Sequence, residues 1–170
     1  MALRIAFIRD DERRDNVHVT RVDGSVLRWI PPGGPGIPHD LLHWLVETDL
    51  GLDRAFWGLV ADGMDFAAAS EAAHGESPLA GRDTTQLMQA EAAAAAVNAR
   101  LTLDGVDDAY CVAYARELCV RQEVVLPEGF DEGAVARLAG SLRGLSEEWT
   151  ALAPRGTLLR RFPRAPEAPP

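Results

Sequence analysis

Two histidines and two carboxylates recur along one short segment, at a spacing that could bind a metal ion. The segment begins at His39 and contains Asp40, His43 and Glu47, with apolar residues between them. On a helix, at about 100° per residue, these four side chains share one polar face. Two imidazoles four residues apart point the same way and can bind one Zn²⁺ together. Glu47 leans back toward the preceding turn, so we expect it to orient His43 through a hydrogen bond.

The same spacing has a simpler interpretation, a solvated helix face whose histidines have no function. The chain has four histidines, and a pair four residues apart arises by chance in roughly 7% of such chains. The two interpretations differ in whether a third ligand converges on His39 and His43.

The five residues from His39 to His43, HDLLH, resemble the HExxH helix of the zinc metallopeptidases known as zincins. The resemblance implies that His39 and His43 are zinc ligands and that Asp40 stands in the place of the general-base glutamate. Asp is one methylene shorter, which would place its carboxylate about 1.5 Å farther from a metal-bound water. In one branch of that family the third ligand is an acid about twenty residues on. Asp62 and Asp65, which follow His43 by 19 and 22 residues, match that spacing. The stretch from residue 37 to residue 66 also resembles small proteins of high-GC bacteria, a resemblance that implies no activity.

Composition excludes several classes of function. The chain has 170 residues, with a hydrophobic fraction of 47% and a net charge of −9, as expected for one globular domain. An acidic chain repels phosphate backbones, so we expect no nucleic-acid partner. All 17 basic residues are Arg, which excludes a Lys Schiff base and a P-loop lysine.

Signals for other compartments and other nucleophiles are weak. Charged residues such as Arg4 and Arg9 interrupt the apolar start of the chain, and no apolar run reaches membrane-spanning length. We therefore expect a cytoplasmic protein with no membrane contact.

Cys111 and Cys119 would lie about 12 Å apart along one helix, too far for a disulfide, and their apolar neighbours predict buried, inert thiols. No GxSxG motif is present.

Strand-like segments come first in the chain. Asp23-Gly24 predicts a tight hairpin turn, in which Thr20 would face Leu27. A further strand is expected near the C-terminus. The expected strands span residues 2–9, 16–22, 25–30 and 156–162.

Helical patterns follow a Gly/Pro-rich connector. The helix expected over residues 107–122 has apolar residues nearly all round, which predicts a central position. Residues 65–83 are expected to form a long loop, with or without a helical turn, in which His74 is a further potential ligand. The expected helices span residues 38–50, 54–64 (capped by Asp53), 84–103, 107–122 and 131–152.

The sequence thus predicts an α+β fold, a small antiparallel sheet packed against four to five helices. We expect one domain over residues 1–162 and a disordered Pro-rich tail over residues 163–170. Two functions fit this fold. The first is a protein that binds zinc or another divalent metal through His39 and His43, with or without hydrolytic activity, and has a small molecule or a protein as its partner. The second is a non-catalytic module whose Ala-rich helix, residues 84–103, packs against a protein partner or a second copy in a homodimer. The sequence does not decide whether the chain is an enzyme.

Overall fold

A four-stranded antiparallel sheet, β3-β2-β1-β4, forms one side of the molecule in the computed structural model, which describes residues 2–10, 15–31, 36–73 and 83–163. Leu3, Ile5 and Phe7 alternate along β1 and are buried, the period-two pattern of a sheet with one face on the core. The C-terminal strand is confirmed, and it pairs with β1 along its whole length. The strands are β1 (Ala2–Ile8), β2 (Asn16–Thr20), β3 (Val26–Trp29) and β4 (Thr157–Pro163).

The β2–β3 hairpin is confirmed, but its expected register is wrong by one residue. Thr20 pairs with Val26, not with Leu27. The N–H of Gly24 donates to the carbonyl of Arg21 at 3.1 Å, and Gly24 takes φ 85° while the residue before it keeps an ordinary φ. This is a three-residue connection that ends in a left-handed glycine, which uses the same turn residues as the two-residue turn that was expected.

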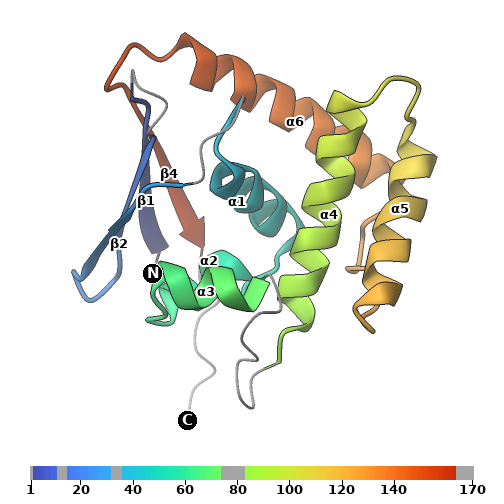
Figure 1. Cartoon of the computed structure of the whole chain (residues 1–170), viewed down its shortest axis with the longest axis horizontal. Coiled ribbons are helices and arrows are strands. Elements are labelled where there is room, and N and C mark those ends of the chain that lie inside the picture. Colours follow the sequence, from blue (N-terminus) through green and yellow to red (C-terminus); the bar gives the residue numbers. More distant parts are fainter. Residues whose placement is uncertain (1, 11–14, 32–35, 74–82, 164–170) are drawn as a thin grey trace.

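The helices cover one face of the sheet and extend away from it (Figure 1). Two expected segments need correction. Residues 65–83 were expected to be a loop, but the structure has an eight-residue helix there, because Asp65 accepts a hydrogen bond from the N–H of Ala68 and alanines favour helix. The second helix begins only at Phe56, without a side-chain cap from Asp53. The helices are α1 (His39–Leu50), α2 (Phe56–Ala61), α3 (Phe66–Ala73), α4 (Thr85–Thr102), α5 (Asp108–Arg121) and α6 (Glu132–Ala151).

The Ala-rich helix α4 lies between α1 and α5 and also contacts α6 (Figure 1). The side chains of Ala92, Ala93, Ala94 and Ala96 are all buried. Small side chains allow neighbouring helices to approach closely. Four of the five alanines in the run are therefore covered by the chain itself.

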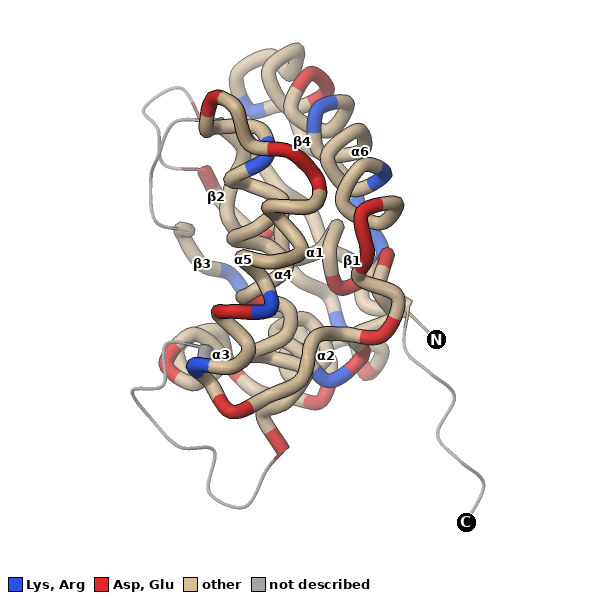
Figure 2. The backbone as a smooth tube through the Cα atoms, turned by 90° about the vertical axis from the view of Figure 1, so that its right-hand side faces the viewer, with Lys and Arg blue, Asp and Glu red and all other residues tan. Residues whose placement is uncertain are grey.

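Helix α5 is peripheral, which contradicts the expectation of a central helix. It buries a single stripe, formed by Cys111, Ala115 and Cys119 at four-residue intervals. Tyr110 and Val120 are exposed, and the outer surfaces of α5 and α6 carry both acidic and basic residues (Figure 2). The prediction of buried cysteines is confirmed.

Aromatic rings fill the space between the sheet and α1 to α3. Trp57 is fully buried, and its indole N–H donates to the carbonyl of Asp40 at 3.0 Å. Its ring lies 5.9 Å from the rings of both Phe7 and Trp29, and Trp29 stacks on Phe66. These contacts fix the first turn of α1 against the sheet.

Two further expectations concern the ends of the chain and membranes. Residues 164–170 of the expected tail lie outside the described residues, and Pro163 ends β4. Among the described helices, none is both long enough and apolar enough to cross a bilayer.

Candidate metal centre

The polar face of α1 is buried, except at its first residue. The helix begins at His39, directly after Pro38, and ends at Gly51, whose φ of 67° suits a left-handed cap. The exposed fractions of Asp40, His43 and Glu47 are 6%, 3% and 1%. This helix face is therefore not solvated as the simpler interpretation expected, apart from His39.

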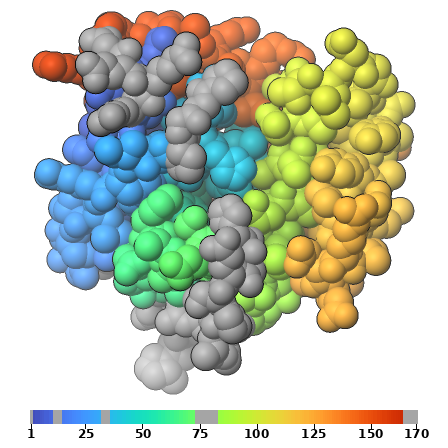
Figure 3. Space-filling model, in the orientation of Figure 1, coloured from blue at the N-terminus to red at the C-terminus, as the bar shows by residue number. Residues whose placement is uncertain are grey.

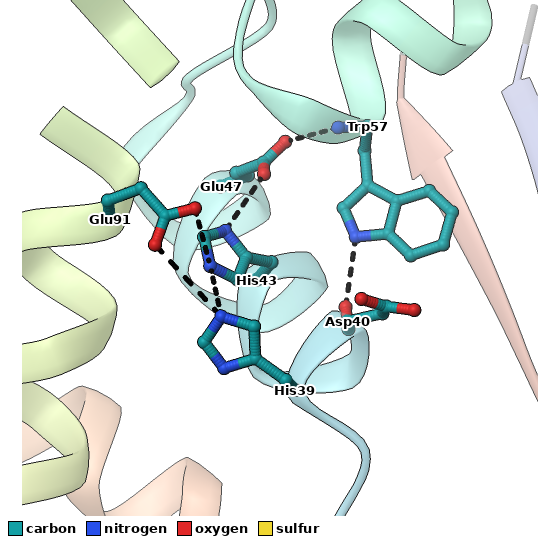
Figure 4. A network of polar contacts seen from close by, with 6 residues as sticks. All are labelled: His39, Asp40, His43, Glu47, Trp57 and Glu91. Atoms are coloured by element: carbon teal, nitrogen blue, oxygen red, sulfur yellow. Dashed lines mark hydrogen bonds and ion pairs between the residues drawn. The ribbon is translucent and has the colours of Figure 1, made fainter. Parts of the chain in front are cut away.

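A third potential ligand reaches the two histidines from α4. His39 Nε2 and His43 Nε2 lie 3.1 Å apart. The carboxylate of Glu91 lies 3.4 Å from His43 Nε2 through one oxygen and 4.0 Å from His39 Nε2 through the other (Figure 4). One donor atom from each of the three residues lies within 4.8 Å of the others.

These separations suit a tetrahedral metal site. With metal–ligand bonds of about 2.0–2.1 Å, two ligand atoms of a tetrahedron are about 3.3 Å apart. The separations of His43 Nε2 from the other two groups, 3.1 and 3.4 Å, are close to that value. Two histidines and one glutamate form a ligand set of catalytic zinc sites, which leave a fourth position open.

Glu47 lies on the far side of the His43 ring, as expected. Its Oε1 is 3.5 Å from His43 Nδ1, and its Oε2 accepts a hydrogen bond from the backbone N–H of Trp57 at 2.9 Å. His43 Nδ1 and Glu47 Oε1 are both buried, and among the described residues neither has a hydrogen bond to any other group. A proton on Nδ1 that points at Glu47 leaves Nε2 with a free lone pair toward His39 and Glu91, the tautomer that binds metal.

The electrostatics of the site favour a bound cation. Burial raises the pKa of Glu47 and of Asp40, because a charged carboxylate loses its hydration. Burial alone lowers the pKa of His43, but the carboxylates of Glu47 and Glu91 outweigh burial and raise this pKa to about 10. The carboxylates of Glu47 and Glu91 thus flank the imidazole of His43, and in the metal-free protein a proton on His43 supplies the compensating positive charge.

Asp40, the expected general base, is turned away from the histidine pair. Its Oδ2 accepts a hydrogen bond of 2.8 Å from the indole N–H of Trp29. In Figure 4 its carboxylate points to the opposite side of α1 from His39 and Glu91. Through this buried hydrogen bond, Asp40 links α1 to Trp29 of β3.

Asp62 and Asp65, the expected third ligands, do not belong to the group around His39 and His43. Asp62 follows the last residue of α2, and Asp65 caps α3. Both acids follow α2, whereas the acid that the structure places beside the two histidines belongs to α4. His74 lies outside the described residues.

Sequence reasoning missed Glu91, although one signal was available. Glu91 is the single acidic residue among the 18 residues of α4, and it directly precedes a run of alanines. A charge in a helix that is otherwise apolar at this point needs a partner when the helix is buried. Comparisons of the chain with protein-family models, with curated proteins and with solved structures find no match.

Proposed function

We propose that this protein binds a divalent transition-metal ion, with zinc as the expected ion, through His39, His43 and Glu91. The observation that carries the proposal is the convergence of two imidazole nitrogens and one carboxylate from two different helices. Mixed nitrogen and oxygen donors suit zinc and its neighbours and do not suit Ca²⁺ or Mg²⁺, which take oxygen ligands.

Two further features support a functional metal rather than a purely structural one. Structural zinc sites have four protein ligands and usually include cysteine, whereas both cysteines of this chain lie in α5. His39 and Glu91 are only partly covered, with side-chain exposures of 59% and 35%. A metal held here would keep an open position toward solvent, where a water or a substrate atom could bind.

Isothermal titration of tag-free, metal-free protein with Zn²⁺ and Co²⁺ at pH 7.5 tests the proposal. We expect one ion per chain, and a melting temperature that rises with added metal, because a ligand bound only by the folded state stabilises it. At a hundredfold excess over the dissociation constant, this stabilisation is about 2.7 kcal/mol.

Two variants and two controls make the test specific. His39→Gln and Glu91→Gln alter side chains that are partly exposed, so both variants should fold, and both should weaken metal binding at least tenfold. The controls are His18→Gln on β2 and Glu117→Gln on α5, neither of which belongs to the group of three ligands. Absence of binding, or equal binding by the two site variants and the wild type, would contradict the proposal.

A further inference from the structure

A cavity of about 620 Å³ opens beside the proposed metal ligands. It lies between α1, α4 and α6, and its walls include His39 and Glu91. In Figure 3 the atoms of α1 lie recessed between those of α4 and α6. Small-molecule sites typically measure about 300–1,000 Å³, so this cavity has the size of a substrate pocket.

The chemistry of the walls restricts what the cavity can hold. One part is apolar, with Leu42 from α1, Ala94 from α4 and Leu142 from α6, all of them buried. Neutral polar groups lie in the same cavity, among them Asn98 and Ser146.

The only charged side chains among the described residues that line the cavity are carboxylates, apart from the imidazole of His39. They are Asp15 and Glu91. No arginine of the described chain belongs to these walls, and the sequence contains no lysine. Among the described residues, a ligand with a negative charge away from the metal would therefore lose hydration without gaining a cationic partner.

We propose that this cavity binds a small molecule with an apolar body, a single metal-binding donor group, and a far end that is uncharged or cationic. The inference rests on the proposed metal site, because the donor group is anchored by the ion that His39, His43 and Glu91 hold. The open coordination position would face the cavity, since His39 and Glu91 line it while His43 is almost fully buried. The apolar body then packs between α4 and α6, where each buried methylene strengthens binding about fourfold.

Three hydroxamates that share one metal-binding head test this proposal. Acetohydroxamate carries the head alone, octanohydroxamate adds an apolar tail, and octanedioic acid monohydroxamate has a tail of the same length that ends in a carboxylate. The probe is the visible spectrum of the Co²⁺-loaded full chain, which reports both metal binding and a change in the coordination of the metal. We expect octanohydroxamate to bind at least 50-fold more tightly than acetohydroxamate, and the terminal carboxylate to remove most of that gain.

A bulky side chain in the cavity provides the matched variant. Ser146→Trp on α6 should abolish the preference for the octanoyl tail while the affinity for Co²⁺ and for acetohydroxamate changes less than twofold. Thr102→Trp, at the α4 side of the cavity, is a second variant with the same expectation if the first does not fold. Ala136→Trp, on the exposed face of α6, should keep the wild-type preference.

The possible outcomes distinguish a failure of the cavity proposal from a failure of the metal-site proposal. Equal affinity for acetohydroxamate and octanohydroxamate on Co²⁺-loaded protein overturns the cavity assignment and leaves the metal site standing. Tighter binding of octanedioic acid monohydroxamate than of octanohydroxamate does the same. Absence of a Co²⁺ spectrum overturns both. A tail preference that the tryptophan variants do not change shows that the tail binds elsewhere and also overturns the cavity assignment.

Discussion

Replacing Glu47 by glutamine should lower the metal affinity of the protein while leaving the stability of the metal-free fold nearly unchanged. The side chain of Glu47 is fully buried, with Oε1 3.5 Å from His43 Nδ1 and Oε2 bonded to the N–H of Trp57. Glutamine has the same size and retains an acceptor for that N–H, so Glu47→Gln removes the charge and turns an amide NH₂ donor, in place of a carboxylate acceptor, toward His43 Nδ1.

The expected magnitudes differ between the metal-free and the metal-bound protein. Two unit charges 3.5 Å apart attract by about 5 kcal/mol at an effective dielectric constant of about 20, but burial of the carboxylate offsets this gain, as its raised pKa indicates. We therefore expect the free energy of unfolding of metal-free Glu47→Gln to lie within about 1 kcal/mol of wild type. Metal affinity should fall about 10- to 100-fold, because the carboxylate behind a histidine ligand fixes its tautomer and its basicity.

Urea unfolding of the metal-free protein and calorimetric titration with Zn²⁺ measure the two quantities on one variant. Glu117→Gln, an exposed position on α5 with an i, i+4 arginine, is the control and should change neither. Glu47→Ala should instead cost at least about 1–3 kcal/mol in the metal-free protein, because it leaves the buried N–H of Trp57 without its acceptor. An affinity loss below twofold in Glu47→Gln, or a loss matched by an equal loss of metal-free stability, would refute the assignment of Glu47 as a positioning residue.

Three other predictions follow from single residues. The pKa of His43 is about 10 in the folded, metal-free protein against about 6.5 in the unfolded chain. The proton on His43 thus stabilises the fold fully below about pH 6.5, and the urea midpoint should fall as pH rises toward 10, less steeply in His43→Gln. Gly58→Ala should cost about 3 kcal/mol or more by thermal unfolding, since a Cβ there would lie 2.0 Å from the carbonyl oxygen of Asp53; a wild-type melting temperature would show that α2 can shift freely. Gly24→Val should cost about 1–3 kcal/mol at φ 85°, and an unchanged melting temperature would argue against the observed turn.

Local patterns were enough to predict the sheet and most of the helix boundaries. Alternation in β1, glycine at the β2–β3 turn, Pro38 before α1 and Asp131 at the cap of α6 each act over a few residues. The hairpin register could not be predicted, because two- and three-residue turns share the same glycine signal. The position of α5 was missed because its composition suggested burial all round, whereas only the stripe of small residues that contains Cys111 is buried.

The candidate site could be predicted only as far as a single helix extends. Periodicity places His39, His43 and Glu47 on one face of α1, and the structure confirms that arrangement. Whether that face is buried, and which acid meets it, depends on how α4 packs against α1. Glu91 lies 48 residues beyond His43, and no local pattern relates the two positions.

The alanines of α4 explain how Glu91 comes to face the histidines. Ala93, Ala94 and Ala96 pack in one core cluster with Leu42 and Val46 of α1, and side chains of this size let two helix axes approach closely. A glutamate one turn before such a contact can reach across the interface with its short side chain. Larger residues in the run would separate the helices and move the carboxylate away from the imidazoles. The run that suggested an intermolecular surface in the sequence thus packs against other helices of the same chain. It brings the proposed third ligand to the histidines, and two of its alanines, Ala94 and Ala95, line the cavity.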